Sequence, residues 1–297
     1  MNFIQQHLIF ILLITIILAL VVFLLIGMAM SKTLITSRYS IDIDALDPQL
    51  DGLRIAHLSD LHGNDHVPVF DVLDQEHVDL ILCSGDIYDG VKRVEETTQF
   101  IQKVLQYAPV YFVSGNHEYY AKNWSQTKQN LKAMGVHVLD NKREEFTLHQ
   151  ATLEICGIED PDLDYNWTYL QRLEQFHKNL EVIPSQIYPR IFINHRADLF
   201  DELPENFADL VFSGHMHGGQ CRLFNRGIFS PFNGDRRVLF PKYTRGIYQR
   251  DRMQMVVSCG LGDQMIVPRL FNPPELVLIT LHAKVKADQC ASKETSR

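Results

Sequence analysis

The chain has 297 residues, of which 46% are hydrophobic, and its 28 Lys and Arg face 36 Asp and Glu, so the formal net charge is -8. This apolar content excludes a disordered or fibrous chain, because it suffices to bury a core. The net acidity disfavours a long nucleic acid as partner, since that partner needs a clustered cationic surface. The five cysteines are widely spaced, which indicates reduced thiols rather than a zinc motif or a disulfide framework.

The first segment, Leu8 to Met30, predicts a membrane-spanning helix. It carries no charge and, at about 1.5 Å per residue, can cross a hydrocarbon core of about 30 Å. A cleaved signal peptide is the alternative, but it normally has a basic start and a shorter apolar run. We therefore expect residues 1–31 to be an uncleaved anchor. Lys32 and Arg38 follow the span, so the positive-inside bias predicts a single-pass cell-membrane protein whose C-terminal domain is cytoplasmic.

After a polar connector at residues 32–52, short apolar runs alternate with helical periods. Strands are expected at 53–59, 78–83 and 110–114, and helices at 67–76, 91–107 and 124–134. The rest of a domain covering 53–282 is richer in strands, expected at 136–139, 145–149, 152–158, 190–194, 210–213, 255–258 and 275–281, with helices near 168–179 and 197–203. This order predicts an α/β fold, a two-sheet β-sandwich flanked by helices. Residues 283–297 are a polar tail that we expect to be mobile.

Five short polar motifs each follow a predicted strand. They contain, in chain order, Asp60 and His62, Asp86 and Asp89, Asn116 and His117, His195, and His215 and His217. The carboxyl ends of strands in an α/β sheet are where ligands bind, so these side chains are expected to open into one crevice. Imidazoles and carboxylates together suit Mn, Fe or Zn. Asp-x-His and His-x-His spacings also place two ligands on the same side of the backbone.

The ordered set D-x-H, G-D-x-x-D, G-N-H-E, a later His and G-H-x-H resembles the calcineurin-like metallophosphoesterase superfamily over about residues 53–281. The stretches SGHMHGGQ and GLGDQMIVPRLFNPPE resemble its bacterial branch of membrane-anchored or exported phosphodiesterases. The resemblance implies one metal held by Asp60, His62, Asp86 and His217. It implies a second metal held by Asp86, Asn116, His195 and His215, with the Asp86 carboxylate bridging the two. It also implies that His117 lies near the leaving group without binding metal and that Asp89 orients it.

Two divalent ions (Mn, Zn or Fe) would lower the pKa of a water that they share. A hydroxide could then form near neutral pH and attack phosphorus in line. His117, whose pKa a nearby Asp89 would raise, could stabilise the phosphoryl charge or protonate the leaving oxygen. We expect a membrane-anchored phosphohydrolase that cleaves a phosphodiester or pyrophosphate, preferably of a lipid or a lipid-linked nucleotide sugar. A nucleotide or cyclic-nucleotide phosphodiesterase is the enzymatic alternative. A non-catalytic interaction module is the more remote one, because it would be expected to have lost ligands.

The window from Arg222 to Arg252 has a charge of +6, from eight basic residues against two acidic ones, and it follows the His-x-His motif. An ordinary solvated insertion is one interpretation. The other is a lip beside the metals that contacts anionic lipid headgroups, since basic and aromatic residues both suit a membrane surface. Its candidate residues are Arg222, Arg226, Arg236 and Arg237. The expected partners are thus a phosphate-bearing substrate and the membrane lipid around the anchor, and the sequence does not indicate an oligomeric state.

Overall fold

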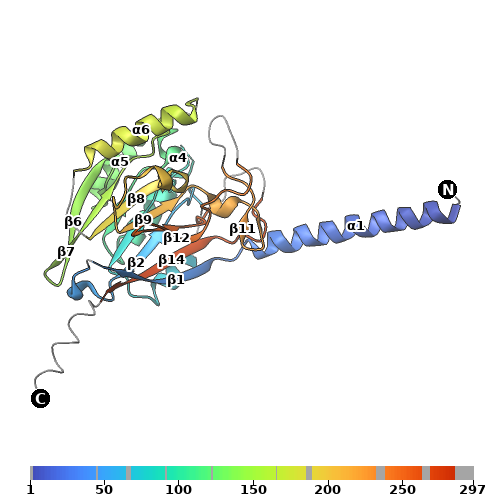
Figure 1. Cartoon of the computed structure of the whole chain (residues 1–297), viewed down its shortest axis with the longest axis horizontal. Helices are drawn as coiled ribbons and strands as arrows, with labels where there is room; N and C mark the ends of the chain where they lie inside the picture. The colour runs from blue at the N-terminus through green and yellow to red at the C-terminus, as the bar shows by residue number, and fades with distance from the viewer. Residues whose placement is uncertain are drawn as a thin grey trace, which may run out of the picture.

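A long N-terminal helix projects from a body made of two packed sheets in this computed structural model (Figure 1). The structure describes residues 3–44, 46–64, 68–90, 92–121, 123–164, 166–184, 189–231, 238–262 and 268–284. Helix α1 spans Phe3–Met30, and none of its most apolar window is buried inside the protein. By length and composition this helix can cross a membrane. The tail was expected to begin at residue 283, but Ala283 is the last residue of a strand; residues 285–297 lie outside the described part of the chain.

The first sheet has six strands in the order β1-β14-β2-β3-β4-β5. The strands are β1 (Ile35–Ile43), β14 (Glu275–Ala283), β2 (Arg54–Leu58), β3 (Leu80–Cys83), β4 (Val110–Phe112) and β5 (His137–Val138). Strands β2 to β5 run parallel, whereas β14 runs antiparallel to β2. The helices in this half are α2 (Pro68–Leu73), α3 (Val94–Val104), α4 (Asn116–Tyr119) and α5 (Trp124–Ala133).

The second sheet has six strands in the order β12-β13-β9-β8-β7-β6. The strands are β6 (Lys142–Leu148), β7 (Ala151–Gly157), β8 (Arg190–Arg196), β9 (Leu210–Gly214), β12 (Gly246–Arg250) and β13 (Met253–Val257). The four inner strands are parallel and the two edge strands are antiparallel to their neighbours. Helix α6 (Tyr169–Val182), 3-10 helices at Pro48–Leu50, Ala197–Glu202 and His217–Gly219, and a short hairpin of β10 (Arg222–Leu223) and β11 (Arg226–Gly227) complete the body.

The two sheets pack face to face, and helices cover their outer sides. Ile55 and Phe212, from different sheets, belong to one buried apolar cluster between them. Ala56, the neighbour of Ile55, belongs to a second cluster that includes Ile101 of α3, because successive strand residues point to opposite faces. Phe176 of α6 covers the outer side of the second sheet in a third cluster. Strands buried on both faces explain the continuous apolar runs of the sequence, and the expected α/β two-sheet sandwich is confirmed.

Residues 32–52 differ from the expected polar connector, because they contain an edge strand of the first sheet. Strand β1 pairs in parallel with β14, from Ile35 opposite Glu275 to Ile43 opposite Ala283. Its sequence, ITSRYSIDI, mixes exposed polar and buried apolar side chains, so it lacks the continuous apolar run of a central strand. The chain therefore passes from α1 into the sheet within a few residues.

Candidate metal centre

All five polar motifs lie at the carboxyl ends of parallel strands. Four follow β2, β3, β4 and β9, whereas His195, which was expected after its strand, lies within β8 itself, one residue before its end. The structure brings together the seven predicted ligands, each at most 6% exposed: Asp60, His62, Asp86, Asn116, His195, His215 and His217. Five of them, Asp60, His62, Asp86, His215 and His217, have left-handed backbone conformations with φ between 46° and 69°. Such a conformation costs roughly 1–2 kcal/mol in a residue other than glycine, and it clusters at functional sites. The sharp turns allow side chains close in sequence to converge.

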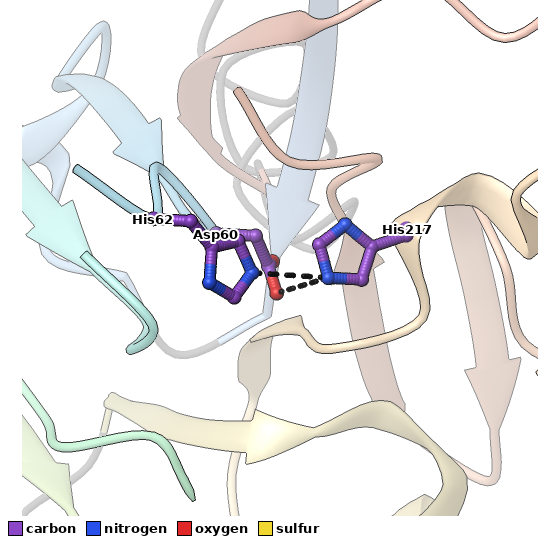
Figure 2. A group of neighbouring side chains, drawn as sticks. All are labelled: Asp60, His62 and His217. Carbon is purple, nitrogen blue, oxygen red and sulfur yellow. Dashed lines mark hydrogen bonds and ion pairs between the residues drawn. The ribbon is translucent and has the colours of Figure 1, made fainter. Parts of the chain in front are cut away.

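The first cluster contains Asp60, His62 and His217 (Figure 2). The Nε2 atoms of His62 and His217 lie 3.1 Å apart, and His217 Nε2 lies 3.5 Å from Asp60 Oδ1. Ligand atoms bonded at about 2.0–2.2 Å to one transition-metal ion lie roughly 3–3.5 Å from each other. The cluster therefore has the spacing of a metal-binding site.

The second cluster contains Asp86, His195 and His215. His195 Nε2 lies 3.2 Å from Asp86 Oδ2 but makes no hydrogen bond, and the buried Asn116 Oδ1 also has no hydrogen-bond partner. Buried polar atoms without partners are costly, and a metal ion would satisfy both. Asp86 Oδ2 also lies 3.9 Å from His62 Nε2 of the first cluster. Asp86 thus stands between the two clusters, as a bridging ligand would.

Burial makes the carboxylate of Asp60 dependent on a nearby cation. Desolvation raises the pKa of Asp60 to about 6, because an ionised carboxylate is costly away from water. The backbone N–H of His215 donates to both of its oxygens at 3.1 Å, and Ser59 Oγ donates to Oδ2. Gly214 leaves the necessary room, since a Cβ there would lie 2.3 Å from Asp60 Oδ2. A divalent ion would offset the remaining cost of ionising this group.

Two ligand imidazoles are oriented by hydrogen bonds to their second ring nitrogens. Nδ1 of His195 donates to the backbone oxygen of Ser84 at 2.7 Å, which would leave Nε2 to bind a metal. Arg196 Nη1 donates to Nε2 of His215 at 3.1 Å, which leaves Nδ1. Arg196 is itself held by Asp160 at 3.0 Å and by Asp162 at 2.9 Å. Sequence reasoning missed these three charged residues, because Arg and Asp outside a motif usually indicate solvent-exposed positions.

Glu118 joins the loops after β3 and β4. Its carboxylate accepts backbone hydrogen bonds from Asp86, Tyr88 and Gly115 at 2.8, 2.9 and 2.8 Å. Burial, reinforced by the charge of Asp86, raises the pKa of Glu118 to about 8. Glu118 therefore supports the loops that carry the predicted ligands.

His117 borders the clusters and is the more accessible member of the predicted catalytic pair. Its side chain is 28% exposed, and its Nδ1 lies 2.9 Å from Asp89 Oδ1. Burial alone would lower the pKa of His117, but the charge of Asp86 and the hydrogen bond to Asp89 outweigh it, so the pKa is raised. Lys92 Nζ contacts the other oxygen of Asp89 at 2.7 Å. The arrangement suits an imidazole that holds a proton next to the ligands.

The four basic lip residues have different positions. The Arg222 guanidinium is buried and donates to the backbone oxygens of Gly218 at 2.8 Å and Asn225 at 2.5 Å, so it supports the turn after His217. Arg226 is exposed on the β10–β11 hairpin. Arg236 and Arg237 lie outside the described residues.

The loop between β13 and β14 supplies two further residues that sequence reasoning did not single out. Asn272 Nδ2 donates to the backbone oxygen of His217 at 2.7 Å. Arg269 Nη2 donates to the backbone oxygen of Cys259 at 2.8 Å and lies 3.4 Å from Nδ1 of His217. Both belong to the stretch GLGDQMIVPRLFNPPE, and the resemblance of this stretch to the bacterial branch was the signal in the sequence that could have identified them. They direct Nε2 of His217 toward the first cluster.

Comparisons with known proteins relate the chain to metallophosphoesterases. The family model described as Calcineurin-like phosphoesterase matches residues 53–219. The chain is 28% identical over 261 residues to an uncharacterized metallophosphoesterase of Aquifex aeolicus, covering 83% of this chain and 91% of the relative. It is 26% identical to a transmembrane protein with metallophosphoesterase domain of Danio rerio, covering 81% and 56%. It is 24% identical to the phosphodiesterase YaeI of Escherichia coli, covering 77% and 82%.

Proposed function

The chain belongs to the calcineurin-like phosphoesterase family and is a hydrolase of phosphoester bonds, and from its site we propose that it is a membrane-anchored, dinuclear metal-dependent phosphodiesterase. The observation that carries the proposal is the pair of buried clusters, because Asp86 belongs to the second cluster and also lies beside His62 of the first. One ion would be held by Asp60, His62, Asp86 and His217, and the other by Asp86, Asn116, His195 and His215. The donor set suits Mn, Zn or Fe.

The protein's own residues would position the substrate and move one proton. When bound, the divalent cations supply Lewis acidity, which activates water and neutralises charge on the phosphoryl oxygens. Asp89 accepts from Nδ1 of His117 and raises the basicity of the ring, so the proton on Nε2 is the one available to the leaving oxygen. His117 is then the general acid, and Asp89 is the residue that positions it.

The substrate we propose is a phosphodiester or pyrophosphate of a lipid or a lipid-linked nucleotide sugar. Support comes from the exposed apolar surface of α1 and from relatives that include a transmembrane metallophosphoesterase and a phosphodiesterase. A pocket beside His215 also has an apolar wall that includes Met216, Pro231 and Val238. Lys32, which follows the span, supports a cytoplasmic position for the body.

His117→Ala tests the catalytic assignment. The variant should keep its metal but lose at least about 100-fold in turnover of bis(p-nitrophenyl) phosphate, the usual contribution of a general acid. The assay uses the full chain purified in detergent with Mn²⁺, and elemental analysis counts the ions bound. His177→Ala, an exposed histidine on α6, is the matched control and should match wild type. Full turnover in His117→Ala would refute the assignment, and about one ion per wild-type chain would refute the dinuclear site.

A substrate screen of the same preparation separates the candidate substrates. Phospholipids in vesicles, nucleotide sugars, and nucleotides including cyclic ones are compared by turnover per chain in the presence of Mn²⁺. The proposal expects the lipid-bearing esters to be the best substrates. A preference for free or cyclic nucleotides would favour the nucleotide phosphodiesterase instead.

A further inference from the structure

The end of α1 is packed against the body at a defined joint. The backbone N–H of Phe271 donates to the oxygen of Gly27 at 3.0 Å, and that of Asn272 donates to Ser31 Oγ at 3.0 Å. The rings of Phe23 and Phe271 lie 4.8 Å apart. Gly27 is required for this approach, since a Cβ there would lie 2.8 Å from the Phe271 ring. The joint therefore sets the direction in which α1 leaves the body.

The β10–β11 hairpin lies on the same side of the body as this joint. Arg222 of β10 donates its backbone N–H to the oxygen of Leu270 at 2.9 Å, directly before Phe271. The segment 238–240 lies beside the hairpin, because Phe240 donates its backbone N–H to Ile228 at 2.9 Å. Figure 1 shows β11 at the base of α1, on the side from which the helix projects. The hairpin, the segment 238–240 and the end of α1 thus form one face.

This face exposes a cluster of large apolar side chains. Eight such side chains are exposed outside α1 in the described part of the chain, and five of them belong here: Leu223, Phe224, Val238, Leu239 and Phe240. We call these five residues the docking face. Phe224 at the tip of the hairpin is 91% exposed, and Leu239 and Phe240 are 61% and 63% exposed. Monomeric soluble proteins rarely expose a contiguous apolar patch unless it contacts a partner or a membrane.

The backbone conformation at the hairpin tip is unfavourable for a phenylalanine. Phe224 and Asn225 have φ values of 48° and 64° in a two-residue hairpin turn. Such a turn favours Asn or Gly at both central positions, and a bulky side chain there is an outlier. A departure from local preference at an exposed tip indicates a requirement for the side chain itself. An aromatic ring that enters lipid would meet that requirement.

The position of the docking face identifies the bilayer as its occupant. The apolar surface of α1 is exposed and ends near Met30, next to the joint, and the first charge of the chain is Lys32. The boundary of the hydrocarbon would therefore lie at the level of the docking face, which continues the apolar surface of the helix. Arg226 is exposed on the same hairpin, where it can contact anionic headgroups.

We propose that the docking face inserts into the leaflet at which α1 leaves the membrane, and that a lipid substrate reaches the metal centre directly from this leaflet. The pocket that His215 lines is also lined by Val238 of the docking face, which gives the route. The inference rests on the proposed membrane anchorage and deepens it. It assigns the source of the substrate: a lipid in the same membrane, taken without passage through water.

Depth measurement of a spin label on the tip tests the insertion. Phe224→Cys is made in the full chain with Cys290→Ser, because Cys83, Cys156, Cys221 and Cys259 are buried. The labelled protein is placed in vesicles of phosphatidylcholine and phosphatidylglycerol. Collisions with oxygen, which dissolves in lipid, should exceed those with a water-soluble nickel chelate several-fold.

The control label is placed at Leu170→Cys, a 74% exposed apolar residue of α6. Figure 1 shows helix α6 on the part of the body away from α1. That label should collide freely with the nickel chelate. Equal nickel accessibility at positions 224 and 170 would overturn the insertion. Turnover of bis(p-nitrophenyl) phosphate by the same vesicles reports on the proposed phosphoesterase function separately, so failure of one is distinguishable from failure of the other.

Charge placed on the docking face tests the route. Phe224→Asp suits the left-handed tip, because Asp tolerates positive φ. It should lower turnover of a fluorescent phosphodiester lipid in vesicles at least tenfold relative to turnover of the soluble diester. Leu170→Asp should keep the wild-type ratio. An unchanged ratio in Phe224→Asp and in Phe240→Asp would overturn the entry of substrate through this face.

Discussion

At the scale of single residues, Arg196 links the metal centre to a buried network of charges. It is 1% exposed, donates to Nε2 of His215, and is paired with the buried Asp160 and Asp162. Arg172 also contacts Asp162, at 2.9 Å. A buried ion pair adds little net stability by itself, but removing one partner leaves an uncompensated charge. The orientation of His215, a predicted ligand, and the stability of the fold thus depend on the same guanidinium.

Arg196→Gln should lower the free energy of unfolding by about 3–5 kcal/mol, the cost of breaking a buried ion pair. Denaturant unfolding of wild type and variant in the same detergent measures the difference. Arg38→Gln removes an exposed arginine that pairs with Glu76 and should cost less than about 1 kcal/mol. Equal costs for the two variants would contradict the assignment of Arg196 to a buried network.

The buried His57 should make the stability of the fold depend on pH. It is fully buried, its Nε2 contacts Ser84 Oγ at 2.7 Å, and desolvation lowers its pKa to about 3. The unfolded chain binds a proton near pH 6.5 while the folded protein does not, so stability is lost as pH falls through this range. Between pH 7 and pH 5 the loss from this residue is about 2 kcal/mol. His57→Gln should show a correspondingly smaller decrease when unfolding is measured at both pH values, and identical decreases would refute this origin.

At the scale of elements, the loop between β13 and β14 connects three parts of the molecule. Asn272 donates its backbone N–H to Ser31 at the end of α1 and its side-chain amide to the backbone oxygens of His217 and Gln220. It is fully buried. One residue therefore holds the end of α1 through its backbone N–H and, through its side chain, the turn that presents a predicted ligand. The position of α1 and the geometry of the first cluster are coupled through this loop.

Asn272→Ala should weaken Mn²⁺ binding by about 10–100-fold, the usual effect of removing a residue that orients a ligand. Titration of metal-free full-length protein with Mn²⁺ measures the affinities of both sites. The affinity of the first cluster should fall while that of the second is retained, because the side-chain amide of Asn272 donates to the turn that carries His217. Asn166→Ala, at an exposed turn, is the control and should not change either affinity. Unchanged binding in Asn272→Ala would show that the loop does not position His217.

At the scale of the whole molecule, bound metal should be part of the stability of the two-sheet body. The ligand loops come from both sheets, so ions held between them would connect β2, β3 and β4 with β8 and β9. A ligand that binds only the folded state, present at 100 times its Kd, raises the free energy of unfolding by about 2.7 kcal/mol. For a body of this size that corresponds to a rise in Tm of about 5–10 °C.

Removal of metal with EDTA should therefore lower Tm by about 5–10 °C, and added Mn²⁺ should restore it. Differential scanning fluorimetry of the full chain in detergent measures the shift. The double variant Asp60→Asn, His195→Ala lacks one ligand of each cluster and should no longer respond to EDTA. A wild-type Tm that is insensitive to EDTA would argue against structural coupling of the sheets by metal.

The net charge of a segment does not show which of its charged side chains face solvent. The window from Arg222 to Arg252 is strongly basic, yet several of its arginines are held by contacts with other parts of the protein. Arg222 donates to backbone oxygens, Arg245 pairs with Glu275 at 3.0 Å, and Arg250 donates to the backbone oxygen of Phe200 at 2.7 Å. A count of charges cannot distinguish a guanidinium held by contacts within the protein from one that faces solvent, because the difference depends on which groups the fold brings next to it.

The sequence by itself determined the apolar span, the alternation of strands and helices along the chain, and the five polar motifs near strand ends. Each of these can be recognised from residues that are close in the sequence. The signals are a long uncharged run, the apolar runs of strands buried on both faces, and polar residues directly after a strand, as with Asp60 and His62. Tertiary structure alone decided the pairing of β1 with β14, the contact of Arg196 with His215, and the joint of Gly27 with Phe271. These depend on partners distant in the chain, and an edge strand, a buried arginine or an exposed phenylalanine carries no local pattern that names its neighbour.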